Sequence, residues 1–450
     1  MMEIDQPEDS VAFERITLPY ASHDDRFVVK DPTFTQQYAG LYFSRLNALR
    51  PAVLQNARAK WQKLHGTSQA PKYVPKLLDI TAGEICYAIG TVYVEMSLKP
   101  NVLEEVADES WETAAEARSK YVSQDDQITL EDESGRVNLT GSRLSDEHLV
   151  TGTVVAVLGR EVPGGSFEVL SVCCAKLQPQ KQITQLPENS PMVAFVSGLN
   201  FGEADNREHA IQMMVDYLTG ELGTLEDQRR ASRIVRVVIA GNTFARKKSD
   251  KIKKLGRRAE AIQFDQQPFD TCDALLGELV SSVPLDIMSG DTDPTNCALP
   301  QQALHFSIFP KACRVSNLNT ATNPHSFSIG DITFLGTSGQ NIDDIYKFVD
   351  LEDRLKIAEK TIEWGHLAPT APDTLWCYPY KDRDPFIVQQ RPHVYFVGNQ
   401  PSFATSFMEG PNGEVTRVVL LPEFSKTATI VLVDLNSLDC IPVRFQEGLQ

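Results

Sequence analysis

Hydrophobic residues in the first sixty or so positions follow a helical spacing that begins after a polar segment. Residues 1–32 are polar and contain three prolines, which favours an extended arm. Apolar residues then recur at helical intervals on both sides of Pro51, and proline normally breaks a helix. The pattern predicts a helical hairpin whose apolar positions are Phe34, Tyr38, Leu41 and Leu46, then Val53, Leu54, Ala57, Trp61 and Leu64.

Between residues 73 and 176 the pattern changes to short runs in which apolar and polar residues alternate. Such runs are typical of half-buried strands, and turn residues such as Gly135 and Pro163 separate them. Five strands, with a short connection between the third and the fourth, predict a small closed Greek-key barrel of the oligonucleotide-binding (OB) type, although other small β-barrels share this pattern. An acidic, alanine-rich stretch near residues 104–122 is expected to be a helix or a loop insertion.

The second half of the chain has a different rhythm. Residues 178–190 are rich in glutamine and proline and predict a linker, after which apolar runs alternate with helical patterns and indicate a layered α/β domain. The run 234–240 is apolar except for Arg236, as expected for a strand buried between helices. The predicted organisation is an N-terminal arm (1–32), a helical hairpin with an OB-fold domain (33–177), a linker (178–190) and an α/β domain (191–450).

Composition narrows the class of protein. A net charge of −17 argues against a main role in gripping phosphate backbones, which requires clustered Lys and Arg. The eight cysteines form no C-x-x-C pair and no zinc-site spacing, so we expect reduced thiols in a soluble intracellular protein. The acidic N-terminus is unlike a signal peptide, and no apolar run approaches the roughly 20 residues that span a bilayer.

Four glycine-containing loops, each directly after an apolar run, carry the candidate chemistry. They are residues 197–200, 241–245, 290–293 and 398–401. In their order and glycine placement they resemble the calcineurin-like phosphoesterases, whose loops read D-x-H, G-D-x-x-D, G-N-H-D and G-H-x-H. Those enzymes hold two metal ions that activate a water for attack on phosphorus. One such loop would be a chance match, whereas four in the right order are a much stronger signal.

Most of the corresponding positions in this chain lack a metal-ligating side chain. Neutral amides are poor ligands for a hydrolytic metal pair, and Gly, Ala and Pro offer no side-chain ligand. Asp293 follows the ligand positions and is not expected to bind metal, and His366 is expected to be structural because a metal needs partners that it lacks. We predict an inactive phosphoesterase-like domain without catalytic residues, metal or cofactor, whose vestigial ligand positions are Gly198, Asn200, Asn242, Ala245, Asp291, Thr292, His366, Asn399 and Pro401.

Two further motifs leave alternatives open. The basic run 246–258 is either a nuclear-import signal, a nucleic-acid contact or a solvated loop. The segment Gly336–Gln340 precedes a helical run but lacks the lysine of a phosphate-binding P-loop, so it is expected to be a turn and a helix N-cap.

An OB-like barrel followed by a degenerate phosphoesterase domain resembles the B-subunits of eukaryotic replicative DNA polymerases, and within this family the delta branch. The stretch 368–374, Ala-Pro-Thr-Ala-Pro-Asp-Thr, and the loop 398–401 are the most specific motifs. The segments that carry the resemblance are 195–199, 238–242, 289–296, 335–341, 366–375 and 396–401.

The resemblance implies a nuclear, non-catalytic scaffold for DNA replication and repair. In the family the B-subunit joins the C-terminal domain of the catalytic subunit of DNA polymerase delta to the third accessory subunit. The same subunit is expected to serve the catalytic subunit of polymerase zeta, to reach the sliding clamp indirectly and DNA mainly through the complex, and to have no membrane partner.

Two alternatives of other classes stay open at this stage. The first is a divergent metal-dependent phosphodiesterase or nuclease that uses Asn242 or His366. The second is a single-strand DNA-binding OB protein, which would need exposed aromatic platforms beside basic residues. The barrel segment offers Tyr87, Tyr93 and Phe167 but few Lys or Arg residues near them.

Overall fold

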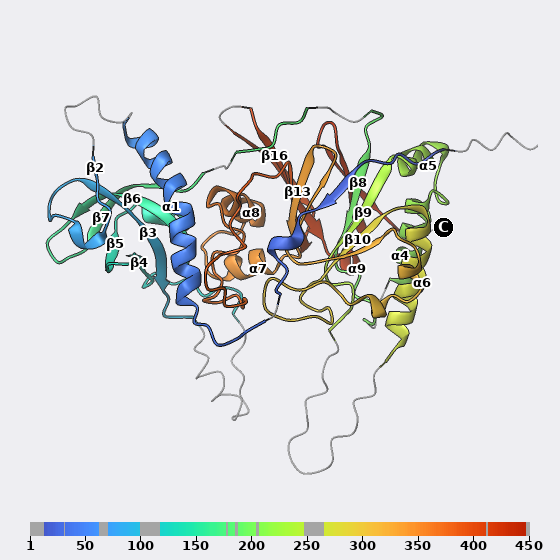
Figure 1. Ribbon diagram of the computed structural model, residues 1–450, viewed down its shortest axis with the longest axis horizontal. Coiled ribbons are helices and arrows are strands. Elements are labelled where there is room, and N and C mark those ends of the chain that lie inside the picture. The colour runs from blue at the N-terminus through green and yellow to red at the C-terminus, as the bar shows by residue number, and fades with distance from the viewer. Residues whose placement is uncertain are drawn as a thin grey trace, which may run out of the picture.

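The computed structural model describes residues 13–30, 32–62, 71–99, 118–176, 179–184, 188–203, 207–246, 265–410 and 413–446. The molecule is elongated, with a small β-barrel at one end and a larger α/β domain at the other (Figure 1). Most of the acidic insert near 104–122 and the basic run 247–258 lie outside the described residues, so the expectations for them are untested. Within these ranges no helix is long and apolar enough to span a bilayer.

The barrel domain is a closed five-stranded sheet, to which the two-residue strand β2 adds by pairing with β3. Its strands are β2 (Lys72–Tyr73), β3 (Cys86–Glu95), β4 (Gln127–Glu131), β5 (Arg136–Thr140), β6 (Val154–Glu161) and β7 (Phe167–Cys173). The order β2-β3-β4-β5-β7-β6 closes through pairing of β3 with β6. A short connection with helix α3 (Leu144–Glu147) joins β5 to β6. Alternating apolar residues therefore form the barrel as the sequence predicted.

The predicted helical hairpin is wrong, because one helix, α1 (Ala39–Gln62), runs through Pro51. Pro51 and Asn47, four residues earlier, are both exposed, so water can satisfy the carbonyl that loses its backbone partner. Residues from both halves of α1 pack on one barrel face, and this shared burial favours a continuous helix. Phe34 lies before α1 and is 75% exposed, so it is not a core residue.

The larger domain contains two six-stranded sheets packed face to face. The first has the order β1 (Tyr20–Ser22), β12 (His325–Ile329), β13 (Ile332–Thr337), β14 (Val394–Gln400), β16 (Val415–Pro422) and β15 (Ala404–Glu409). The second has the order β11 (Leu318–Ala321), β10 (Leu285–Met288), β9 (Ile234–Ala240), β8 (Met192–Val196), β17 (Thr429–Asp434) and β18 (Cys440–Arg444). Side chains from both sheets form one core between them.

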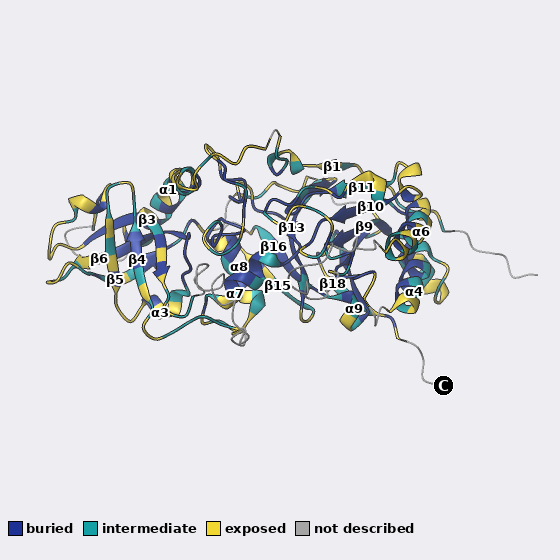
Figure 2. Ribbon diagram, turned by 90° about the horizontal axis from the view of Figure 1, so that it is seen from below, coloured by how far each residue is buried: buried dark blue, intermediate teal, exposed yellow. Residues whose placement is uncertain are grey.

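Helices cover the outer faces of both sheets. Helices α4 (Glu208–Thr219), α5 (Leu225–Ser232) and α6 (Gln267–Ser282) lie on the second sheet, and α7 (Gln340–Lys347) and α8 (Arg354–Glu363) on the first. A one-turn helix, α9 (Phe424–Thr427), joins β16 to β17. Figure 2 shows the strands dark with burial between partly exposed helices. Strand β9 therefore has helices on one face and the first sheet on the other face. The prediction of helices on both faces was wrong. A helix and a second sheet both bury the strand face that they cover, so an apolar sequence does not distinguish them.

The described parts of the N-terminal arm (13–30) and of the linker (179–184 and 188–190) are packed rather than free. Strand β1 of the arm extends the first sheet by pairing with β12, and Phe27 is fully buried after the short helix η1 (Asp24–Arg26). In the linker, the Gln180 amide donates hydrogen bonds to the carbonyls of Pro392 and Val415 (3.1 and 2.7 Å). Both segments therefore complete the surface of the α/β domain.

Candidate functional site

The four glycine loops meet at one edge of the two-sheet core. Three of them follow β8, β9 and β10, whose parallel pairing brings their carboxyl ends together. The fourth lies at the C-terminal end of β14 in the other sheet. Gly198 N donates to Gly241 O (3.0 Å), Asn200 N to Asn242 O (3.1 Å), and Asn399 N to Ser197 Oγ (2.9 Å). Loops distant in sequence therefore form one hydrogen-bonded cluster, which we call the loop cluster.

Left-handed backbone explains the residue types at four of the positions predicted from the sequence. The φ angles are 66° at Gly198, 50° at Asn200, 54° at Asn242 and 55° at Asn399. Glycine and asparagine tolerate this region best among the common residues. Both types therefore fit a turn requirement of the fold, independent of any metal.

A cleft of about 860 Å³ opens beside the loop cluster. Of the nine predicted positions, the structure brings four to its wall: Asn242, Asp291, Thr292 and Asn399. The other five do not line it: Gly198, Asn200, Ala245, His366 and Pro401. The Asn200 amide instead donates to Glu423 Oε1 (2.6 Å) and Ser425 Oγ (3.0 Å).

The cleft's carboxylates are already engaged with other side chains. Asp291 pairs with Arg246 (2.9 Å), and Asp343 pairs with Arg354. Asp344 accepts hydrogen bonds from two threonine hydroxyls, and Glu423 pairs with Lys426. Among the described residues, no group of three or more His, Cys, Asp or Glu side chains that could share a metal lies in this cleft. The carboxylates of the cleft are therefore distributed among separate ion pairs and hydrogen bonds.

Asp293 is a brace within the loop cluster. Its carboxylate accepts hydrogen bonds from Phe244 N and Gly290 N, both at 2.8 Å, and so ties the second loop to the third. Burial raises the pKa of Asp293 to about 7, against the opposing effect of the amides that donate to it. Asp293 therefore has a structural role between the second and third loops.

His366 belongs to a buried network at the boundary between the two domains. His366 Nε2 and Arg45 Nε each lie 2.8 Å from Asp384 Oδ2, and all three side chains are buried. His366 Nδ1 accepts from Ala368 N (3.2 Å), so its proton lies on Nε2. Burial and then the Arg45 charge lower the pKa of His366, which favours the neutral ring. This geometry fits the structural role that was predicted.

Arg45 was missed by the sequence interpretation. It leaves α1 and donates to the carbonyls of Gly152 (3.2 Å), Pro369 (2.8 Å) and Ala371 (2.6 Å). One guanidinium thereby joins the helix, the barrel and the α/β domain. The sequence signal was a lone Arg in an apolar helical pattern, which does not identify its partner.

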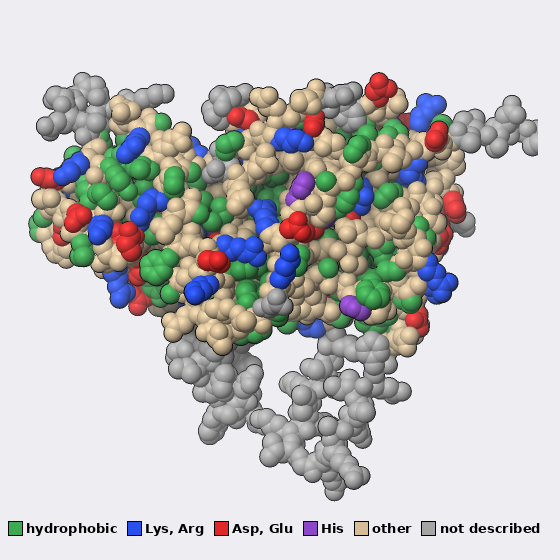
Figure 3. Space-filling model, viewed as in Figure 1, with side chains coloured by type: hydrophobic (Ala, Val, Ile, Leu, Met, Phe, Trp, Pro, Cys, Tyr) green, Lys and Arg blue, Asp and Glu red, His purple; other side chains and the backbone are tan. Residues whose placement is uncertain are grey.

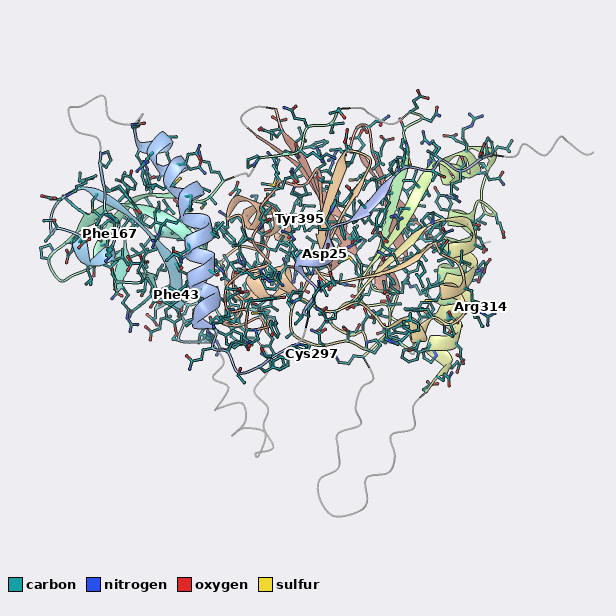
Figure 4. All side chains as sticks on the ribbon, viewed as in Figure 1. Asp25, Phe43, Phe167, Cys297, Arg314 and Tyr395 are labelled. Atoms are coloured by element: carbon teal, nitrogen blue, oxygen red, sulfur yellow. The ribbon has the colours of Figure 1, made fainter. Side chains whose placement is uncertain are left out.

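The barrel aromatics are largely unable to stack on bases. Tyr87 is buried against Trp61 of α1 (ring centroids 5.0 Å apart), and Phe167 is fully buried. Figure 4 shows Phe167 inside the barrel and Phe43 on α1 at its boundary with the α/β domain. Only Tyr93 of the three is partly exposed, at 36%. The stacking platform that a single-strand-binding protein needs is therefore not available from these residues.

The structure thus defines a class of multidomain protein in which an OB barrel is fused, through a packed helix and linker, to a two-sheet α/β domain. Two family models match the two parts. The DNA polymerase delta OB-fold domain family matches residues 37–172, and the B-subunit family of DNA polymerases alpha and epsilon matches residues 193–405. B-subunits are the non-catalytic subunits of DNA polymerase complexes.

Relatives match over nearly the whole chain. The DNA polymerase delta small subunit of Arabidopsis thaliana is 40% identical over 99% of this chain and 98% of its own length. The DNA polymerase delta small subunit of Saccharomyces cerevisiae is 34% identical over 98% of this chain and 96% of its own length. The DNA polymerase II small subunit of the archaeon Methanothermobacter thermautotrophicus is 25% identical over 60% of this chain and 56% of its own length. The chain belongs to the DNA polymerase delta small subunit family, whose function is in DNA replication.

Proposed function

We propose that this chain is the accessory subunit that bridges the C-terminal domain of the catalytic subunit of DNA polymerase delta to the third subunit. The observation that carries the proposal is the 40% identity to the Arabidopsis delta small subunit across 99% of the chain. The bridge acts in replication and repair in the nucleus and also serves polymerase zeta. It reaches the sliding clamp and DNA through the other subunits.

Three features of the chain support a scaffold rather than a DNA-gripping role. The net charge is −17, Tyr87 and Phe167 of the barrel are buried, and the Arg45 network fixes the barrel against the α/β domain. A fixed pair of domains offers a rigid surface to two partners, and rigidity reduces the entropy lost on assembly.

Co-expression tests the bridge. The full chain is co-expressed with the C-terminal domain of the catalytic subunit, with the third subunit, and with both, and each mixture is analysed by affinity capture and size-exclusion chromatography. We expect both pairs and a 1:1:1 complex. A chain that elutes alone, or two partners that co-purify equally well without it, would contradict the proposal.

We further propose that the loop cluster is a phosphoesterase site that has lost its metal ligands. The engaged carboxylates and the asparagines at left-handed positions support this interpretation. The purified chain is expected to cleave neither single-stranded DNA nor a chromogenic phosphodiester above the buffer rate with Mn²⁺ present. Manganese-dependent cleavage that Asn242→Ala or His366→Ala abolishes would favour the divergent nuclease instead.

A further inference from the structure

A second hollow, of about 400 Å³, lies on the first sheet and shares no lining residue with the cleft of the loop cluster. Three segments far apart in sequence enclose it: the arm, the linker and the loop before β14. We call it the arm hollow. Its lining residues are His23, Arg26, Lys181, Ser326, Ser328, Thr333, Phe334, Leu335, Gln389, Gln390 and Pro392.

The floor of the arm hollow is a polar sheet face. Strand residues alternate between faces, and Phe327, Ile329 and Ile332 point into the core between the sheets. Ser326, Ser328 and Thr333 occupy the opposite face and line the hollow. Helices need an apolar sheet face to pack on, so hydroxyl side chains here fit a solvent-filled hollow rather than a covering helix.

The rim of the arm hollow carries cationic and amide side chains. Arg26 Nη1 donates to Ile387 O (3.2 Å), and no other side-chain hydrogen bond joins Arg26 to the described residues. Burial lowers the pKa of Arg26 to about 10, partly opposed by Asp24, so the guanidinium stays charged at neutral pH. Lys181 lies on the rim in an ion pair with Asp331 (3.0 Å), and His23 Nε2 is hydrogen-bonded to Ser328 Oγ (3.1 Å). Gln389 and Gln390 are exposed. Figure 3 shows a histidine with Lys or Arg side chains near it in the middle of this face.

The carboxylates nearest the arm hollow are paired with groups of its own rim and floor. Asp24 accepts from Ser326 N and contacts His325 Nδ1, both at 2.7 Å. Asp331 pairs with Lys181 (3.0 Å) and accepts from Thr184 N (3.0 Å). Among the described residues that line the hollow, none is acidic. The lining therefore offers cationic and amide donors and no carboxylate. Arg26, which forms no ion pair with the described residues, is the cation best placed to meet an oxyanion.

We propose that the arm hollow binds a small phosphate-bearing molecule of up to nucleotide size. Arg26 would hold the phosphoryl oxygens together with Lys181, which would exchange its contact with Asp331 for the ligand. The Ser326 and Ser328 hydroxyls would donate from the floor, and Gln389 and Gln390 would contact the remainder. The volume falls within the range of small-molecule sites, roughly 300–1,000 Å³. The acidic surface of the chain disfavours a long nucleic-acid backbone as the occupant.

Calorimetry on the full chain tests the proposal with inorganic phosphate, AMP and a single-stranded 20-mer, each at matched ionic strength. We expect saturable binding of phosphate or AMP that Lys181→Gln weakens roughly tenfold, since the substitution removes a hydrogen bond between charged groups. Ser328→Ala, which removes only a floor hydroxyl, is expected to weaken binding less, with unchanged circular dichroism.

Lys356→Gln is the matched control, because it removes the same charge from an exposed position on α8. Equal losses in Lys181→Gln and Lys356→Gln, or no binding of either small molecule, would overturn the proposal. Binding of the 20-mer without phosphate or AMP would also overturn it in favour of a nucleic-acid backbone. Lys181→Gln is expected to leave co-purification with the polymerase subunits intact, so the result is separable from the bridging test.

Discussion

Single residues hold the loop cluster together through close backbone approaches. A Cβ on Gly290 would lie 2.2 Å from Asn242 N and 2.4 Å from Asn242 Oδ1. Asn242 in turn accepts from Thr292 N through Oδ1 (3.3 Å). The glycine is thus required by packing between two loops, whatever chemistry the loops perform.

Gly290→Ala is expected to lower the free energy of unfolding by about 2–4 kcal/mol, because the loops must separate to admit a methyl group. Gly277→Ala is the control, since its Cβ would meet nothing closer than 3.7 Å and the site is helical. It should raise stability by about 0.5–1 kcal/mol. Urea denaturation followed by fluorescence measures both, and similar destabilisation by the two variants would contradict the packing argument.

His325 is a second residue whose environment has a measurable consequence. It is fully buried with Nδ1 2.7 Å from Asp24 and Nε2 3.5 Å from Asp286. Burial alone would lower its pKa, but the hydrogen bonds to the two aspartates raise the pKa to about 9. The imidazolium thereby fastens the arm to both sheets.

The pKa of His325 is higher in the folded chain than in the unfolded chain. Its contribution to the free energy of unfolding is therefore full below about pH 6.5 and is lost as the pH rises through about 9. The loss is at most about 3.5 kcal/mol, from roughly 1.4 kcal/mol per pKa unit. Urea midpoints measured from pH 6 to 9.5 should fall for the parent chain. His325→Gln should be less stable at pH 6 with a flatter profile, and parallel profiles would contradict this assignment.

At the scale of elements, α1 shows how packing overrides a local breaker. Leu46, Leu49, Val53, Ala57 and Trp61 share one barrel-facing core on both sides of Pro51. The helix continues through Pro51 because one missing backbone hydrogen bond costs less free energy than the burial of these apolar side chains contributes.

Pro51→Ala is expected to stabilise the chain by about 1–3 kcal/mol, since it restores a helical donor at an exposed position. Arg58→Ala, also exposed on α1, should change stability by less than about 0.5 kcal/mol. Thermal unfolding compares the two. A destabilising Pro51→Ala would indicate that a break at Pro51 is needed after all.

At the scale of the whole molecule, the two domains are joined through a buried ionic network rather than by the linker alone. Arg45, His366 and Asp384 lie at their boundary, where Arg45 also donates to backbone of both domains. Burial raises the pKa of Asp384, but His366 and Arg45 outweigh it and hold the pKa below its usual range. A partner that spans both domains would meet a fixed geometry.

Arg45→Met should cost about 3–5 kcal/mol, because it leaves a buried carboxylate with one partner fewer. Arg45→Met with Asp384→Asn should cost less than the sum of the single changes, which a double-mutant cycle measures. Arg160→Ala, which breaks an exposed pair with Glu168, should cost less than about 1 kcal/mol. Additive losses for Arg45 and Asp384 would contradict the network.

The sequence by itself determined the elements with strong periodicity and the family. The run at 234–240 matches β9 in its bounds, and the alternating runs between 73 and 176 predicted the barrel strands. The glycine loops were placed at strand ends for the same reason: local pattern reports burial and turn conformation, and both are properties of neighbouring residues.

Only the tertiary structure decided which segments meet. The continuity of α1, the sheet opposite β9, the pairing of β1 with β12 and the Arg45–Asp384 contact join positions far apart in sequence. The arm hollow likewise gathers three distant segments with no shared motif. Burial and hydrogen bonding depend on partners in space, and one sequence states which residues are apolar or charged without stating what they face.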